Sequence, residues 1–428
     1  MLTEHICRYE VKTVTGSMRS ETISEAVVLA AGEGTRLRPL TYTRPKVLIP
    51  IANSPFIEHQ LRLLDSLGIE RVVLITGYMR EMISDWVDSV SGLDMEVVMR
   101  VQREARGTAD AIRTAEGSVE GRFLVLNGDV ILDRGSLAKM LEGKTTSVGA
   151  KAVPNPRDYG VFEIRDGLVR RVLEKADSPP SNLANVGSYI FGPPIFDRIR
   201  ETPPNPVRRE IEITDTLQAI IDSGEPVRCY EVEEWFELGK PWDILELNET
   251  FLAVGRVSGG RAEEGARDAD VNIGDGSVVE AGARVLEPSV IGEECTVATG
   301  SVVGPLSSIG NGVTIDGARV EGSVILEGSI IGGGSTVEYA VMGAGCRVGP
   351  GAKLLGRSRD GRGVRMEIKG RRLDSGRDRL GPILGDRCVI GARGKIGPGV
   401  TLDPDTEIEP GDEIRTRGGS PATRKDIY

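Results

Sequence analysis

The sequence predicts an α/β domain with a mostly parallel sheet, followed by a parallel β-helix of hexapeptide repeats. In the first half, apolar runs typical of buried strands alternate with segments of helical periodicity, which implies strand–helix–strand units. In the second half, aliphatic residues recur every six positions, which is the period of coils in a parallel β-helix. A chain of 428 residues is long enough for two or three such domains.

The elements of the first half follow in chain order. The apolar run at residues 26–31 predicts the first strand, and Ile57, Leu61 and Leu64 fall on one face of a helix that Gly68 ends. We expect a further helix at residues 80–90 and strands at residues 71–76, 95–101 and 123–127. Parallel sheets bind ligands beyond the carboxyl ends of their strands, so polar residues that follow strands are the first site candidates.

A glycine-rich turn, Gly32-Glu33-Gly34-Thr35-Arg36, follows the first strand, and Lys46 comes ten residues after Arg36. Glycine lets backbone N–H groups approach a phosphate closely, and the two cations can neutralise a triphosphate. No Gly-Lys-Ser/Thr closes a Walker A loop, and Leu37 occupies the place of the third glycine of a dinucleotide turn. Taken alone, the first Gly-x-Gly is equally consistent with a structural turn.

The hexapeptide period begins after a linker rich in Gly, Ala and charged residues. Inward-pointing aliphatic residues are expected every six positions at Ile273, Val279, Val285, Ile291, Val297, Val303, Ile309 and Ile315. The phase then shifts, and the period resumes at Ile325, Ile331 and Val337, and again at Met342, Val348 and Leu354. It returns once more from Leu384 to Ile414. One loop at residues 356–380 interrupts the coils with nine basic and four acidic residues, a net charge of +5. One interpretation is that this loop binds an anion or a neighbouring subunit. The alternative is that it is a solvated, salt-bridged segment.

Composition favours an intracellular enzyme, which we expect in the cytoplasm. A net charge of −11 disfavours nucleic-acid binding, and no apolar run approaches the length of a membrane span. The five scattered cysteines never form Cys-x-x-Cys, which argues against a disulfide framework or zinc site. Residues 1–22 lack the apolar segment of a signal peptide. The expected parts are an extension (1–22), a first domain (23–252), a linker (253–270), a β-helix (271–415) and a tail (416–428).

The run from Leu29 to Thr41, followed by Arg44-Pro-Lys-Val-Leu-Ile-Pro-Ile, resembles the signature of the sugar-1-phosphate nucleotidylyltransferases. These enzymes join a nucleoside triphosphate to a sugar 1-phosphate and release pyrophosphate. The repeats resemble the left-handed β-helix domains attached to many of them, which pack into trimers. From end to end the chain resembles the archaeal-type bifunctional sugar-1-phosphate nucleotidylyltransferase/acetyltransferases. The resemblance implies a Rossmann-like nucleotidyltransferase domain followed by a left-handed parallel β-helix.

The resemblance also implies roles on the nucleotide side. Arg36 and Lys46 would be the catalytic cations, and Asp129 and Glu237 would be ligands of Mg²⁺. Family members commonly carry Asp at the place of Glu237, which leaves Asp243 as the fallback ligand. The nucleotide-binding residues would be Gly32, Gly34, Thr35, Gln102, Gly107 and Thr108, with Gln102 reading a pyrimidine edge. The alternatives are that Asp129 caps a helix and that Gln102 is an exposed loop residue.

On the sugar side, the resemblance implies contacts from Gly160, Glu174, Lys175 and Asn185, although Glu174 and Lys175 also fit an exposed strand pair. The choice between UTP and dTTP stays open because uracil and thymine differ only by a methyl group. The choice between glucose 1-phosphate and N-acetylglucosamine 1-phosphate also stays open. The acetyltransferases use a β-helix histidine as base, whereas this chain has only His5 and His59. The missing histidine argues against a bifunctional enzyme, which is one alternative to a nucleotidyltransferase. A non-catalytic scaffold subunit is the other alternative.

Overall fold

The computed structural model describes residues 23–206, 209–253, 261–262, 271–358, 361, 363–417 and 420–422. The predicted extension, most of the predicted linker and most of the predicted tail lie outside the described residues. The chain divides into two compact units. The first contains the described residues up to Glu33 and Phe56–Glu237, and the second contains Gly34–Pro55 and the described residues from Leu238 onward. The domain boundaries expected from the sequence stay a prediction.

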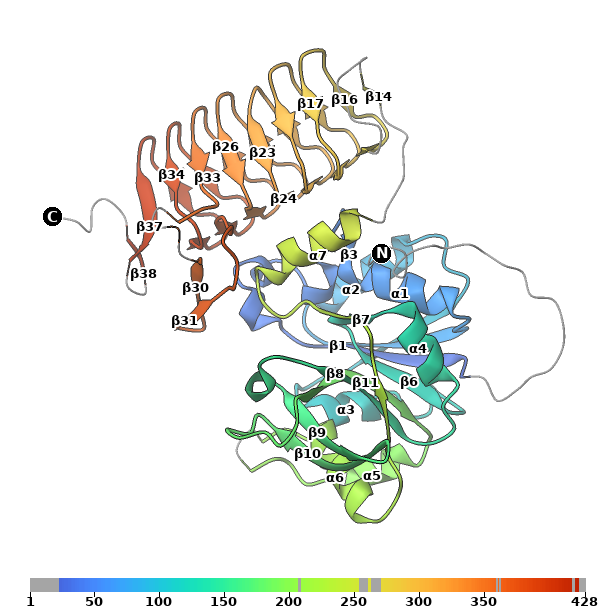
Figure 1. Ribbon diagram of the computed structural model, residues 1–428. Helices are drawn as coiled ribbons and strands as arrows, with labels where there is room; N and C mark the ends of the chain where they lie inside the picture. The colour runs from blue at the N-terminus through green and yellow to red at the C-terminus, as the bar shows by residue number, and fades with distance from the viewer. Residues whose placement is uncertain are drawn as a thin grey trace. The chain divides into compact units, whose positions relative to one another are not determined.

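The first unit is built on a nine-stranded sheet whose order is β5-β4-β1-β6-β11-β8-β12-β10-β9 (Figure 1). Its first four strands are parallel, as the apolar runs predict: β5 (Glu96–Val101), β4 (Arg71–Thr76), β1 (Glu25–Ala30) and β6 (Phe123–Asn127). The others are β11 (Leu183–Phe191), β8 (Ser147–Ala152), β12 (Arg228–Glu231), β10 (Leu168–Glu174) and β9 (Gly160–Arg165). Because β11 runs antiparallel to β6, the sheet is mixed beyond this point.

Helices cover this sheet, and their apolar residues make its core. The helices are α1 (Phe56–Ser66), α2 (Arg80–Ser89), α3 (Thr108–Arg113), α4 (Arg134–Leu141), α5 (Ile195–Glu201) and α6 (Ile213–Asp222), with a short 3-10 turn at Pro156–Asp158. Val27 and Val125 of the sheet form one buried cluster with Ile112, Phe196 and Leu217 from α3, α5 and α6. A separate antiparallel pair is formed by β7 (Val130–Leu132), which directly follows β6 in the chain, and β13 (Trp235–Glu237).

The second unit contains three parallel sheets whose short strands stack coil upon coil (Figure 1). One sheet contains β14 (Arg261–Ala262), β16 (Val278–Val279), β19 (Thr296–Val297), β22 (Thr314–Ile315), β25 (Ile330–Ile331), β28 (Arg347–Val348), β33 (Val389–Ile390) and β36 (Glu407–Ile408). A second contains β15 (Asn272–Ile273), β18 (Ser289–Ile291), β21 (Ser307–Ile309), β24 (Val324–Ile325), β27 (Val341–Met342), β32 (Ile383–Leu384) and β35 (Thr401–Leu402). The third contains β17 (Arg284–Val285), β20 (Val302–Val303), β23 (Arg319–Glu321), β26 (Thr336–Glu338), β29 (Lys353–Leu354), β34 (Lys395–Ile396) and β37 (Glu413–Arg417), with β38 (Ser420–Ala422) antiparallel at its end.

This stack confirms the predicted left-handed parallel β-helix, and the residues predicted to point inward form one buried apolar cluster. Val279 pairs with Val297, eighteen residues further on, whereas Ile309 pairs with Ile325, only sixteen further on. The shifts of phase seen in the sequence are therefore five-residue steps, the first of which runs from Ile315 to the inward-facing Val320. The basic loop at 356–380 contains a hairpin, β30 (Arg365–Ile368) with β31 (Arg371–Asp374).

The second unit also contains α7 (Asp243–Leu252) and the segment Gly34–Pro55, whose elements are 3-10 turns at Thr35–Leu37, Leu40–Tyr42 and Lys46–Leu48, and strands β2 (Pro50–Ile51) and β3 (Ser54–Pro55). Arg44 fixes this segment to the β-helix, because its Nη2 lies 2.8 Å from both carboxylate oxygens of Asp386. Both residues are buried, so removing either partner would leave an unpaired buried charge and would strongly destabilise the fold. Asn248 of α7 accepts a hydrogen bond from the Ala52 N–H at 3.0 Å and another from the Ser308 hydroxyl at 2.6 Å.

Candidate active site

A cavity of about 720 Å³ opens at the carboxyl edge of the first unit's parallel strands. Ala31 follows β1, Gly77 follows β4 and Gln102 follows β5, and all three line the cavity. Because ligands of parallel sheets bind at this edge, the cavity is the candidate site for the nucleotide.

Gln102 is fixed in this cavity by its side-chain amide. Its Nε2 donates to the carbonyl oxygen of Gly107 at 3.1 Å and to Oδ2 of Asp110 at 3.1 Å. Asp110 is only 8% exposed and pairs through Oδ1 with Arg113 at 2.8 Å. With both amide hydrogens engaged, Gln102 presents its Oε1 as an acceptor, which is what the imide N–H of uracil or thymine requires.

The turn at Gly107-Thr108 is determined by its packing against residues 211–213. Gly107 has a φ of +103°, and a Cβ there would lie 2.5 Å from the carbonyl oxygen of Ile211, so only glycine fits. The Thr108 hydroxyl accepts from the Ile213 N–H at 3.0 Å and lies 3.2 Å from Oε2 of Glu212. The turn therefore holds Gln102 and the first residues of α3 in one arrangement.

Asp129 and Glu237 come from two paired strands. Asp129 directly precedes β7, and in the antiparallel pair Glu237 at the end of β13 lies opposite Val130. The register therefore brings the two acids predicted as metal ligands to the same end of the pair. Gln60 of α1 holds the turn between β6 and β7, because its Nε2 donates to the carbonyl oxygens of Asn127 at 2.9 Å and Val130 at 2.6 Å.

These acids fit a magnesium ion by the chemistry of their donor atoms. Mg²⁺ prefers oxygen ligands and is commonly held by one or two carboxylates together with substrate phosphates and waters. Among the described residues, no three or more His, Cys, Asp and Glu side chains gather as a metal cluster. A pair of carboxylates that is completed by substrate oxygens is consistent with both facts.

Asp243, the fallback ligand, accepts two hydrogen bonds from the backbone. One of its carboxylate oxygens, Oδ2, accepts hydrogen bonds from the N–H groups of Gly239 at 2.9 Å and Lys240 at 2.7 Å. Burial is the largest influence on this carboxyl and raises its pKa from 3.8 to about 6. The side chain thus closes the turn that leads into α7.

The glycine-rich turn is shaped by close packing inside the second unit. Gly34 has a φ of +66°, and a Cβ at this position would lie 2.8 Å from Cβ of Lys46. Its carbonyl oxygen accepts from the Thr41 hydroxyl at 3.0 Å and from the Leu37 N–H at 2.8 Å. Glycine therefore brings the backbone before Thr35 and Arg36 against Lys46, while Gly32 belongs to the first unit.

The four residues predicted on the sugar side come from adjoining strands. Gly160 of β9 pairs with Glu174 of β10, and a Cβ on Gly160 would lie 2.6 Å from Oε2 of Glu174. Lys175 follows Glu174, and Asn185 lies on β11, which also pairs with β9. Asn185 donates to the Tyr189 hydroxyl at 2.8 Å and accepts from the Gly187 N–H at 3.0 Å, so its amide orientation is fixed.

Two residues that hold the site were not predicted from the sequence. Gln60 is buried among the apolar residues of α1, where it occupies the same face as Ile57, Leu61 and Leu64. The sequence did contain a signal for Gln60, because a polar residue on the buried face of a predicted helix needs a hydrogen-bond partner. Asp110 gave no comparable signal, because its role depends on where the preceding turn places Gln102.

Fold and site together are typical of a nucleotidyltransferase: parallel strands end at a nucleotide-sized cavity, and a pair of carboxylates follows the neighbouring strand β6 and its partner β13. Residues 25–253 match the family described as "Nucleotidyl transferase", and the chain belongs to that family. Residues 285–369 match a second description, "GMPPB C-terminal domain".

Curated relatives extend the similarity through both units. The chain is 33% identical over 390 residues to "Bifunctional protein GlmU" of Methanococcus maripaludis, which covers 90% of this chain and 93% of that protein. It is 30% identical to "Bifunctional sugar-1-phosphate nucleotidylyltransferase/acetyltransferase" of Sulfurisphaera tokodaii, over 90% of this chain and 96% of that protein. It is 32% identical to "Glucose-1-phosphate thymidylyltransferase" of Streptomyces griseus, over 74% of this chain and 92% of that protein.

A solved structure confirms the fold of the first part of the chain. The crystal structure of UDP-glucose pyrophosphorylase complexed with UDP-glucose superposes with a TM-score of 0.50 at 24% identity, over 54% of this chain and 99% of that one. None of the described helices has the length and apolar character needed to cross a membrane.

Proposed function

We propose that this protein transfers a nucleotidyl group from UTP or dTTP to a hexose 1-phosphate, either glucose 1-phosphate or N-acetylglucosamine 1-phosphate, and releases pyrophosphate. The observation that carries the proposal is the fixed amide of Gln102 in the cavity at the sheet edge, because it fits a pyrimidine imide. Family membership and the relatives named as sugar-1-phosphate enzymes support the same reaction.

In this reaction a phosphate oxygen of the sugar 1-phosphate attacks the α-phosphorus of the nucleotide. The new P–O bond forms as the bond from the α-phosphorus to the bridging oxygen breaks, and pyrophosphate leaves. The attacking phosphate is already ionised near neutral pH, so no general base is needed. The protein contributes position and charge: Gln102 orients the base, while Arg36 and Lys46 neutralise the phosphates.

Asp129 and Glu237 are the residues proposed to hold Mg²⁺, which when bound would neutralise charge on the triphosphate oxygens. The sugar is held by the backbone at Gly160 and by Glu174 and Asn185, whose side chains reach hydroxyl or acetamido groups. Lys175 faces the sugar phosphate. Nucleotide contacts come from Gly32, Gly34, Thr35, Gly107 and Thr108.

The β-helix is proposed to assemble three copies of the chain in the cytoplasm and not to transfer acetyl groups. Residues 271–415 contain no histidine. Cys346 and Cys388 cannot replace it because both are fully buried in the apolar core of the coils. Glucosamine 1-phosphate should therefore cause no release of thiol from acetyl coenzyme A, and release at several turnovers per second would support the bifunctional alternative instead.

The test of nucleotidyl transfer is pyrophosphate release across a panel of triphosphates and sugar 1-phosphates with Mg²⁺. We expect turnover with UTP or dTTP and at least one hexose 1-phosphate, and little with ATP or GTP. Turnover that prefers purine triphosphates would contradict the role of Gln102. Absence of turnover with every pair would favour the scaffold subunit.

A further inference from the structure

The second unit contains a cavity of about 450 Å³ whose lining carries five cations, and we call it the hairpin pocket. Arg36 and Arg38 line it from the glycine-rich segment, and Arg365, Lys369 and Arg372 line it from the β30–β31 hairpin. All five belong to the same compact unit. The acidic residues in the lining are Glu367 and Asp403, so the charge of the lining is five minus two, or +3.

The hairpin presents its two faces differently. Met366 and Ile368 are buried, whereas Arg365 and Glu367 alternate with them and are exposed. Opposite residues of an antiparallel pair share a face, and Glu367 lies opposite Arg372 while Ile368 lies opposite Arg371. Arg372 therefore shares a face with Arg365 and Glu367 and lines the pocket. Arg371 lies on the face of Ile368, and although Ile368 also borders the pocket, Arg371 does not line it.

The connection between the strands is a two-residue turn of Lys369 and Gly370, with φ values of +51° and +73°. Positive φ at both central residues is typical of the tight hairpin turns that match the twist of the strands. The turn places Lys369 at the tip of the hairpin, where its side chain lines the pocket.

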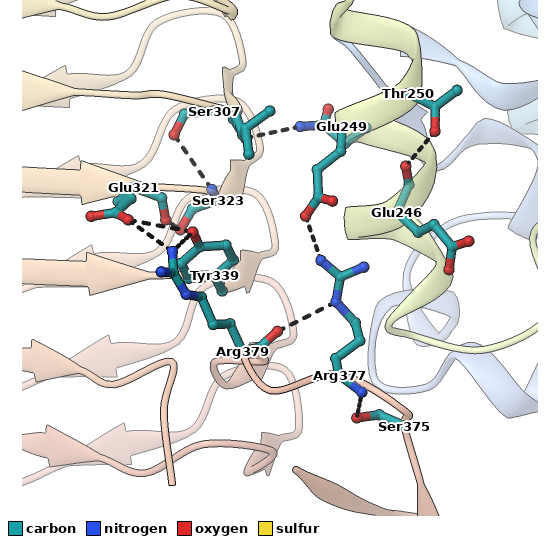
Figure 2. Close-up of polar contacts among 12 residues, drawn as sticks. Glu246, Glu249, Thr250, Ser307, Glu321, Ser323, Tyr339, Ser375, Arg377 and Arg379 are labelled. Carbon is teal, nitrogen blue, oxygen red and sulfur yellow. Dashed lines mark hydrogen bonds and ion pairs between the residues drawn. The ribbon is translucent and has the colours of Figure 1, made fainter. Parts of the chain in front are cut away.

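Other arginines of the basic loop are used as anchors. Figure 2 shows that Arg377 pairs with Glu249 of α7, and that Arg379 contacts Glu321 and the Tyr339 hydroxyl. Arg365 lies 3.6 Å from Asp374. By contrast, the side chains of Lys369 and Arg372 are exposed and make no hydrogen bond or ion pair with any residue in the described part of the chain. The loop is thus salt-bridged at its base, while Lys369 and Arg372 near its tip form no ion pair among the described residues, although Glu367 lies opposite Arg372 in the hairpin register.

We propose that the hairpin pocket binds the pyrophosphate end of the nucleoside triphosphate, with Lys369 and Arg372 as additional phosphate-binding residues. This inference rests on the proposed function. Its link to the reaction is Arg36, which lines the pocket and belongs to the turn assigned to the triphosphate. Pyrophosphate is a multiply charged anion, and guanidinium groups bind its oxygens with strong, charge-assisted hydrogen bonds.

Neighbouring contacts keep the cations of the glycine-rich side in place. The guanidinium of Arg38 lies over the ring of Tyr42, with Cζ 4.8 Å from the ring centroid. Such stacking holds the arginine side chain beside the hairpin pocket. When the bond to the α-phosphorus breaks, negative charge grows on the departing pyrophosphate, and the cations of the hairpin pocket would stabilise it.

The test compares Arg372→Ala with Arg371→Ala, two variants that remove the same charge from opposite faces of one strand. In the intact protein, Arg372→Ala should raise KM for the triphosphate, and KM for pyrophosphate in the reverse reaction, by about tenfold, as for the loss of a hydrogen bond to a charged group. KM for the sugar 1-phosphate should not change. Arg371→Ala should leave all three constants as in the wild type.

Lys369→Asn is a second variant that keeps the fold, since asparagine tolerates positive φ better than most residues. It should shift the same two constants in the same direction, and Arg372→Lys should recover part of the loss. Equal KM values for the wild type and Arg372→Ala, or an equal shift for Arg371→Ala, would overturn the assignment.

Calorimetry of pyrophosphate binding separates this inference from the proposed function. Weaker binding to Arg372→Ala than to Arg371→Ala would support the hairpin pocket even if the wild type showed no transfer. Turnover by the wild type together with identical pyrophosphate affinities for both variants would sustain the proposed function and refute the hairpin pocket.

Discussion

The side chain of Gln60 donates a hydrogen bond to the carbonyl oxygen of Asn127 at 2.9 Å and another to that of Val130 at 2.6 Å. Gln60 is 0% exposed, so these bonds form where water cannot replace them. The two carbonyls flank Asp129, the proposed metal ligand. A buried amide on α1 therefore fixes the turn that carries the proposed metal ligand.

Replacing this amide should loosen the metal turn. Gln60→Leu removes both donors and leaves buried carbonyl oxygens without them, which should lower the free energy of unfolding by about 1–3 kcal/mol. Because Asp129 is then less well positioned, half-maximal activity should require more Mg²⁺. Denaturant unfolding and a metal titration measure the two effects, with Glu58→Gln on the same helix as control. An unchanged Mg²⁺ requirement would show that Gln60 has only a structural role.

Asp110 should determine base selectivity through Gln102. Asp110→Ala removes the acceptor that lies 3.1 Å from Nε2 of Gln102. The Gln102 amide can then rotate, and its oxygen is no longer held in the orientation that accepts from a pyrimidine imide. We expect the ratio of kcat/KM for UTP to that for ATP to fall by roughly tenfold, the scale of one lost hydrogen bond. Steady-state kinetics with both triphosphates measure it, and Glu104→Ala, an exposed change nearby, serves as control. A retained ratio would contradict the assignment.

Asp243 should make stability depend on pH. Burial raises its pKa from 3.8 to about 6, so the folded protein binds a proton more tightly than the unfolded chain. The resulting stabilisation is fully present below about pH 4 and is lost as the pH rises through 6, by about 3 kcal/mol at most. Asp243→Asn removes this contribution, so the difference in Tm between wild type and variant should change with pH. If the Tm of the wild type and of Asp243→Asn differed by the same amount from pH 4 to 7, the raised pKa of Asp243 would be refuted. Asp222→Asn is the control for the loss of an acid elsewhere.

Assembly through the β-helix should depend on its outward apolar residues. Ile330 is 42% exposed, and along its sheet the outward positions include Val278, which is also 42% exposed. Ile330→Glu places a charge on this row and should convert the proposed trimer to monomers in sedimentation velocity. Thr336→Glu, on the outward side of another sheet, should leave the trimer intact. A wild-type chain that sediments as a monomer would contradict the proposed assembly.

The sequence predicted most of the fold because its periodicities are direct consequences of packing. Each coil of the β-helix places one inward aliphatic residue on each of its three sheets, so Ile273 and the later inward residues could be identified individually from the sequence. The shifts of phase were visible, but their cause was not, since a five-residue step that ends at Val320 breaks the period without breaking the stack. The hairpin at Arg365–Asp374 was also not predicted, although charged and apolar residues alternate in the four positions before Lys369-Gly370.

Within the candidate site, motif residues were easier to predict than the residues that hold them. Gln102 and Asp129 follow strands, where polar side chains meet at a sheet edge. Asp110 and Gln60 act through other residues, and their partners are defined only once the turns have formed. Asp243 was predicted from the sequence as a fallback metal ligand. In the structure its carboxylate accepts hydrogen bonds from two backbone N–H groups, a role that the sequence does not reveal.

Pyrophosphate release by Asp129→Asn tests the central claim most directly. Asp129→Asn keeps the size of the side chain and removes the charge, so with Mg²⁺, a pyrimidine triphosphate and a hexose 1-phosphate its rate should fall at least about 10²-fold below wild type. Lys46→Ala should lose a similar factor. Asp166→Asn, the same change at an exposed turn, should keep the wild-type rate. A wild-type rate in Asp129→Asn and Lys46→Ala would contradict the proposed active site.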